Sequence, residues 1–83
     1  MTVTVRYFAS IREAIGQGCE AVDTAATTLG ALRDELIARG GAHASSLARG
    51  RAVRMALNQT LSDESATLAD GAEVAFFPPV TGG

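Results

Sequence analysis

Two side chains in this sequence could form a nucleophile and its base, namely Cys19 and His43. A cysteine nucleophile needs a base within hydrogen-bond reach, and nothing in the sequence brings these two residues together. Cys19 is therefore expected to be a small apolar or strand-edge residue, and His43 a solvated loop residue. The adjacent carboxylates at 34–35 and 63–64 are expected to be solvated, on a helix surface and in a turn. No spacing typical of metal ligands occurs, so no metal site is predicted.

The segment AFFPPVTGG at 75–83 is the remaining place where chemistry could be done. Pro78 and Pro79 cannot extend a sheet, and together they impose a stiff, extended exit from the strand before them. The four residues after them have side chains that shrink to none: Val80, Thr81, Gly82 and Gly83. Glycine backbone passes through a channel too narrow for a Cβ atom and lets a partner's groups approach the last carboxylate. We therefore expect this segment to insert into another protein, with the Gly83 carboxylate as its working group.

Composition restricts the classes of protein that remain. The 83 residues correspond to one small domain, and 47% hydrophobic with 19% charged residues is ordinary for a globular protein. The net charge of −2 provides no basic field for nucleic acid. A lone cysteine forms no internal disulfide and suits a reducing cytoplasm. Neither a signal peptide nor an apolar run of membrane-spanning length is found, so a soluble, cytoplasmic protein is expected.

The elements that must position the tail begin with a strand at 2–9, where apolar and polar residues alternate. The residues expected on one face of it are Val3, Val5 and Tyr7. A short helical turn should follow, with Ser10 and Glu13 as a capping box and Gly16 as its end. Residues 19–24 read as a second strand that pairs back on the first.

A helical period starts at Thr28, which is the predicted N-cap. The apolar stripe of this helix consists of three leucines: Leu29, Leu32 and Leu36. Arg33 is expected to point outward, and the glycines at 40–41 should end the helix. Residues 40–51 then form a small-residue connection, with one helical turn around 46–49.

Alternation resumes in AVRMALNQTL at 52–61, with a turn at 58–59, and again in AEVAFF at 72–77. In the last strand, Val74 and Phe76 should face inward and Phe77 outward. The resulting order predicts an α+β domain of the β-grasp, or ubiquitin-like, fold, a mixed sheet of four to five strands packed on one main helix. We expect residues 1–77 to form that domain and residues 78–83 to form an extended tail.

Four segments carry a resemblance to a known family. They are VRYFASIRE at 5–13, LNQTL at 57–61, LADGAEVAFF at 68–77 and FFPPVTGG at 76–83. Together they resemble the small subunits of molybdopterin synthase over essentially the whole chain, and the ending is the most specific part. The resemblance implies a sulfur carrier of molybdenum cofactor biosynthesis. It would be a non-catalytic sulfur-donor subunit, with the catalytic groups on the large subunit.

The resemblance also implies a sequence of partners. A ubiquitin-activating-like adenylyltransferase, using ATP and magnesium, would adenylate Gly83, and a desulfurase- or rhodanese-type donor would convert it to a thiocarboxylate. The tail would then insert into the large subunit of a heterotetramer and donate sulfur to a cyclic pterin phosphate. The chain itself would bind no cofactor. Phe8, Leu61 and Phe77 match positions at the large-subunit interface of that family.

Two alternatives remain open from the sequence. The first is a ubiquitin-like modifier that conjugates through Gly83 to lysines of other proteins. All seven basic residues are arginines, which forbids lysine-linked chains of this protein on itself but not conjugation to others. The second is a sulfur carrier for another pathway, such as thiamine biosynthesis.

Overall fold

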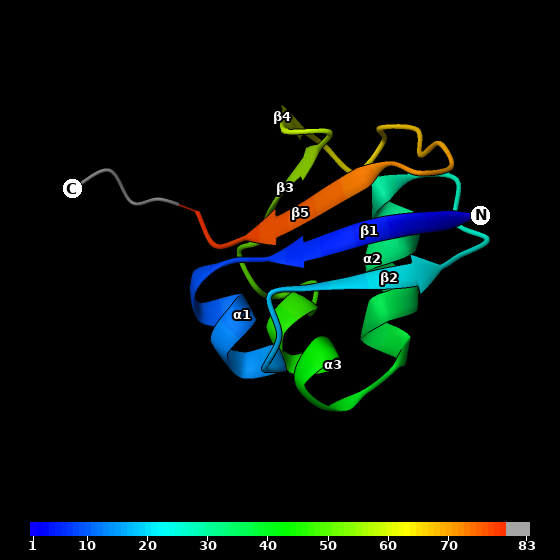
Figure 1. Ribbon diagram of the computed structural model, residues 1–83. Helices are drawn as coiled ribbons and strands as arrows, with labels where there is room; N and C mark the ends of the chain where they lie inside the picture. The colour runs from blue at the N-terminus through cyan, green and yellow to red at the C-terminus, as the bar shows by residue number, and fades with distance from the viewer. Residues whose placement is uncertain (80–83) are drawn as a thin grey trace.

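The computed structural model describes residues 1–79, in which five strands form one mixed sheet of order β2-β1-β5-β3-β4. The strands are β1 (Thr2–Tyr7), β2 (Cys19–Asp23), β3 (Arg54–Leu57), β4 (Thr60–Ser62) and β5 (Glu73–Phe77). β1 and β5 lie side by side and parallel in the middle of the sheet (Figure 1), and the other pairs are antiparallel. The first and last strands of the domain therefore form its centre.

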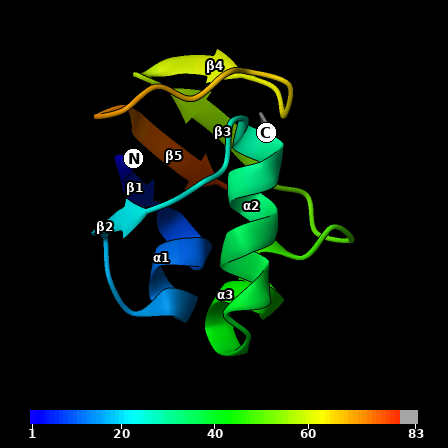
Figure 2. The ribbon, with the colours of Figure 1, turned by 90° about the vertical axis from the view of Figure 1, so that its right-hand side faces the viewer.

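Three helices pack on one face of this sheet, and Figure 2 shows the two layers edge on. They are α1 (Ala9–Ile15), α2 (Leu29–Ala38) and α3 (Gly41–Leu47). This two-layer arrangement around the main helix α2 confirms the predicted β-grasp fold. Within residues 1–79, no helix covers the opposite face of the sheet, which we call the open face. Its residues on β1 and β2 are exposed.

Alternation along the strands decides which side chains enter the core. The inward residues of the two central strands are almost fully buried: Val3, Val5, Tyr7, Val74 and Phe76. The predicted leucine stripe of α2 packs against them, and Thr28 caps that helix by accepting a hydrogen bond from the Ala31 amide at 3.2 Å. The predicted inward faces of both central strands are therefore confirmed.

The start of α1 differs from the prediction. The capping box of Ser10 and Glu13 is wrong, because the N-cap lies two residues earlier, at Phe8, which makes no side-chain capping bond. The Phe8 carbonyl accepts the amide of Ile11 at 3.2 Å, so the turn closes before Ser10 could cap it. The predicted end is confirmed, since Gly16 adopts a left-handed φ of 89°.

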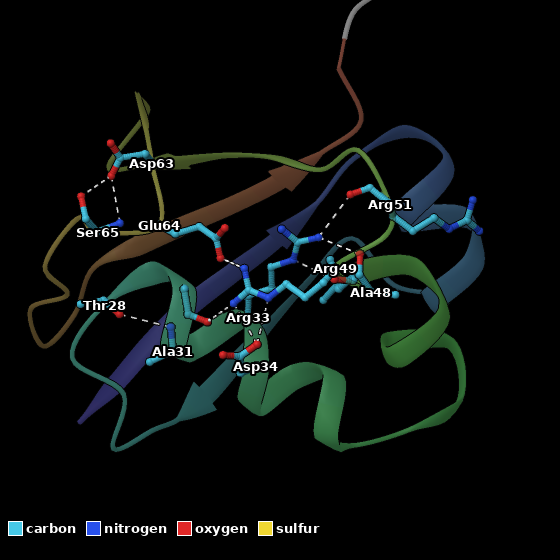
Figure 3. A network of polar contacts seen from close by, with 12 residues as sticks. Thr28, Ala31, Arg33, Asp34, Ala48, Arg49, Arg51, Asp63, Glu64 and Ser65 are labelled. Atoms are coloured by element: carbon cyan, nitrogen blue, oxygen red, sulfur yellow. Dashed lines mark hydrogen bonds and ion pairs between the residues drawn. The ribbon is translucent and has the colours of Figure 1, made fainter.

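The connection after α2 is more ordered than predicted, because 41–47 form a full helix rather than one turn near 46–49. Its carboxyl end explains why the outward orientation expected for Arg33 is wrong. The Arg33 side chain is buried, and its guanidinium donates to the carbonyls of Leu47 at 2.7 Å and Ala48 at 2.8 Å (Figure 3). The last carbonyls of a helix have no partner within the helix, and Arg33 supplies one.

Two of the carboxylates predicted to be solvated also form ion pairs. Asp34 and Glu64 are substantially exposed, as expected, but the Arg49 guanidinium forms ion pairs with both (Figure 3). Arg49 also donates to the Gly30 carbonyl at 3.1 Å. This contact set joins α2 to the segments before β3 and after β4, so we assign it to stability rather than to chemistry.

The prediction that His43 is a solvated loop residue is wrong. His43 lies on α3, with its ring edge against Tyr7 at 5.9 Å between centroids. Its Nε2 is 2.9 Å from a carboxylate oxygen of Glu20, which also accepts the Tyr7 hydroxyl at 2.7 Å. Arg39 pairs with the other Glu20 oxygen at 2.7 Å. Three side chains, from β1, the end of α2 and α3, thus meet at the Glu20 carboxylate of β2, a long-range arrangement that spacing along the chain does not reveal.

The Glu20 contacts predict how stability depends on pH. Burial alone would raise the pKa of Glu20, but hydrogen bonds from His43, Arg39 and Tyr7 outweigh it and lower the pKa to about 2. A carboxyl group with a depressed folded-state pKa stabilises the fold above its unfolded pKa, near 4.5. That contribution is lost as pH falls from about 5 toward 2.

We therefore expect Glu20→Gln to lower the free energy of unfolding by about 2 kcal/mol at pH 7 and by much less at pH 2. Denaturant titrations of both proteins across this pH range measure the difference. Parallel stability curves for the two proteins would contradict the assignment of this carboxylate as a stabilising anion.

Candidate functional site

The tail begins at Pro78, directly after β5 in the middle of the sheet. Beyond the last paired strand residues, the Phe8 amide donates to the Phe76 carbonyl at 3.2 Å, which keeps β1 and β5 together up to the point of exit. Pro78 and Pro79 follow and are partly buried. Pro78 lines hollows on two sides, one of them shared with Ile11 and Val53. The exit is thus fixed by packing as well as by the two proline rings.

The remaining predicted tail residues lie outside the described part of the chain: Val80, Thr81, Gly82 and Gly83. Their proposed role in insertion stays a prediction.

Aromatic side chains meet on the open face beside this exit. Phe8 is 41% exposed and Phe77 is partly buried, and both line a hollow of about 600 Å³. The rest of its apolar lining consists of Ala9, Ala75, Pro78 and Pro79. Phe76, by contrast, is fully buried and stacks on Tyr7 with centroids 6.4 Å apart. The predicted strand register, with Phe76 inward and Phe77 outward, is confirmed.

Leu61 lies on the same face but not in this hollow. It is 62% exposed on β4 and lies opposite Ala56, which in turn lies opposite Ala75. Leu61 lines a neighbouring hollow of about 750 Å³ with Arg54 and Met55. The structure therefore brings Phe8 and Phe77 together and places Leu61 two strands away on a continuous surface. Exposed apolar side chains spread over such a surface are typical of a protein-binding face. We call this surface the docking face, and it consists of Phe8, Leu61, Phe77 and the two alanines between them, Ala56 and Ala75.

Two charged residues at the aromatic hollow were not singled out from the sequence. Arg6 and Glu73 line the aromatic hollow, and their charged groups are 3.9 Å apart. The Arg6 guanidinium also lies over the Phe8 ring, 5.7 Å from its centroid. The signal was present, because alternation in the first strand puts Arg6 on the same face as Phe8.

The two residues that could have formed a nucleophile and its base, Cys19 and His43, do not lie together. Cys19 is exposed at the start of the edge strand β2, which confirms the strand-edge prediction. It lies opposite Arg6 on the open face, whereas His43 packs with α3 on the helix side. Among residues 1–79, no group of three or more histidine, cysteine or acidic side chains could hold a metal ion. No helix in this part of the chain is long and apolar enough to cross a membrane.

Comparisons with known proteins agree with this geometry. Residues 5–83 match the model of the ThiS family. A relative from Escherichia coli strain K12 named "Molybdopterin synthase sulfur carrier subunit" is 42% identical over 81 residues, which is 98% of this chain and 99% of that protein.

Two solved structures share the fold over the whole of both chains. SAMP1 from Haloferax volcanii is 26% identical, with a TM-score of 0.79 and 100% of each chain covered. A complex of subunits 1 and 2 of the molybdopterin-converting factor from Helicobacter pylori 26695 contains a chain that is 30% identical. It matches with a TM-score of 0.70, again over 100% of each chain.

Proposed function

The chain belongs to the ThiS family, and we propose that it is the sulfur carrier subunit of a molybdopterin synthase. One observation carries the proposal. The central strand β5 runs past the aromatic hollow and is followed directly in the sequence by PPVTGG, so the docking face lies next to the start of the tail. The name and the 42% identity of the Escherichia coli relative support this function over the modifier and thiamine-pathway alternatives.

The proposed main partner is the large subunit of the synthase. The similarity to a chain in the two-subunit complex from Helicobacter pylori supports this choice. The docking face, with Phe8, Leu61 and Phe77, binds the large subunit in a heterotetramer and holds the root of the tail at the entrance to its active site. Aromatic side chains that become fully buried are the usual energetic centre of such an interface. Residues 78–83 then enter the large subunit.

The chemistry proposed for the tail begins with activation. On an adenylyltransferase, the Gly83 carboxylate attacks ATP with the help of magnesium, and pyrophosphate leaves. A carboxylate is a poor electrophile until one of its oxygens can depart, and adenylation makes AMP the leaving group. The terminal sulfur of a persulfide on a desulfurase- or rhodanese-type donor then attacks the acyl adenylate, displaces AMP together with that oxygen and forms an acyl disulfide. A thiol reduces this acyl disulfide by cleaving its S–S bond and is itself oxidised to a disulfide. The product is a thiocarboxylate, which is anionic at neutral pH and is a soft nucleophile.

Sulfur delivery follows inside the large subunit. The thiocarboxylate attacks the cyclic pterin phosphate, and hydrolysis of the resulting thioester returns Gly83 to the carboxylate. The carrier needs no cofactor of its own in this scheme, because ATP and magnesium act on the adenylyltransferase and the catalytic groups belong to the large subunit. We place these reactions in the cytoplasm.

Intact mass spectrometry tests the carrier function. After incubation with the adenylyltransferase, ATP, magnesium and a sulfur donor, the protein should gain the mass difference between sulfur and oxygen. A variant ending at Gly82 is the matched control and should not support pterin conversion. An unchanged mass with active loading enzymes would contradict the proposal. Covalent adducts on lysines of other proteins would favour the modifier alternative instead.

A further inference from the structure

A row of five paired residues crosses the open face of the sheet. In order from the β2 edge, these are Cys19, Arg6, Ala75, Ala56 and Leu61. The two alanines make the middle of the row shallow, and Arg6 is its only charged residue. Arg6 lies on a central strand, so a partner that covers Phe8 and Phe77 must also cover its guanidinium.

The Arg6 guanidinium has few acceptors within the protein. Among residues 1–79 it donates no hydrogen bond, and its contact with the Glu73 carboxylate is long, at 3.9 Å. Four other arginines do donate hydrogen bonds inside the protein: Arg33, Arg39, Arg49 and Arg51. The Arg6 side chain is 47% exposed, so water satisfies its donors in the free protein.

Docking removes that water. A guanidinium has five N–H donors, and burying them without acceptors is costly. Even if the Glu73 carboxylate moved closer, a single carboxylate would accept hydrogen bonds from only some of the five N–H groups. Of the other side chains that line the hollow, only Gln59 carries an acceptor, a single amide oxygen, and the rest are apolar. The partner must therefore supply an acceptor, and a carboxylate is the best match because it can accept two parallel hydrogen bonds from a guanidinium.

We propose that Arg6 is a specificity-determining residue of the docking face, and that the cognate large subunit places an aspartate or glutamate side chain against it. This inference rests on the proposed function, since it concerns the same partner. Arg6 thus selects a partner that carries an acid at this point. It disfavours partners that present an apolar or basic surface there, because its charge would be buried unpaired.

The test measures binding of the cognate large subunit by titration calorimetry at low and high salt. Arg6→Met should weaken binding about tenfold or more and reduce its salt dependence. Arg6→Glu should weaken it further, because two like charges would then meet. Arg12→Met is the matched control, since it changes the net charge equally but lies in a separate hollow on α1. It should bind within about twofold of the parent protein.

The outcomes separate this inference from the function on which it rests. If the parent protein binds and Phe77→Ala weakens binding, but folded Arg6→Met binds as tightly as the parent, then no acid faces Arg6 and the inference is wrong. Weakening by Arg12→Met equal to that by Arg6→Met would also overturn it, because the effect would come from net charge alone. If the parent protein does not bind a large subunit, the proposed function fails, and the inference fails with it.

Discussion

A chain lengthened by one residue beyond Gly83 is expected to transfer no sulfur while it keeps the fold and stability of the parent protein. The proposed reaction uses the Gly83 carboxylate itself, and a peptide bond at that position leaves no carboxylate there to adenylate. An added alanine would also place a Cβ atom where glycine passes a narrow channel. The loss should therefore be complete rather than partial. Pterin conversion with the purified large subunit measures it.

Binding of the extended chain to the large subunit provides the internal control. The docking face is unchanged, so affinity should fall much less than activity does. Mass spectrometry after the reaction must confirm that the added residue is still present. Full sulfur transfer by the untrimmed, extended protein would rule out Gly83 as the working group.

Phe76→Ala and Phe77→Ala are expected to have opposite effects, although the two residues are adjacent. Phe76 is fully buried, and truncating such a side chain costs about 3–5 kcal/mol, a large part of the stability of a small domain. The melting temperature of the Phe76→Ala variant should therefore be lower than that of the parent protein by more than about 12 °C, or the variant should not fold. Phe77 faces the hollow, so Phe77→Ala should cost only about 1 kcal/mol of stability. Its binding of the large subunit should weaken by about 2 kcal/mol, roughly thirtyfold.

Thermal melts and titration calorimetry on the two variants decide between core and docking roles. The pair is its own control, because both variants remove the same side chain from the same strand. If Phe77→Ala melts as low as Phe76→Ala while its folded fraction binds normally, then Phe77 is a core residue. The docking face would in that case lack its central aromatic side chain.

The central strands could be predicted from the sequence because strand alternation has a direct physical cause. Successive side chains point to opposite faces of a sheet, so the pattern of Val3 and Val5 in the first strand already specifies the inward face. The same rule predicts that Phe76 points inward and that Phe77 points outward. It also places Arg6 on the same face as Phe8.

The helical side of the domain could be predicted less well. The segment GAHASSL, which forms α3, has one large apolar residue, Leu47, and so carries no helical stripe to detect. The burial of Arg33 and the contacts of His43 both follow from where α3 packs. Each depends on contacts between residues more than ten positions apart, which periodicity cannot report. These incorrect predictions, for α3, Arg33 and His43, concern the stability of the fold, and none of these residues lies on the docking face.

The position of β5 has a consequence for biosynthesis. The last strand to be made lies between β1 and β3, so neither half of the sheet can be completed during translation until Phe77 has left the ribosome. Pairing the two ends of a domain has a high contact order, and such domains fold slowly compared with those held by local contacts. Nascent chains that stop short of β5 therefore remain unfolded and are open to proteolysis. Folding itself thus serves as quality control, because a native carrier has necessarily been translated to the base of its functional tail.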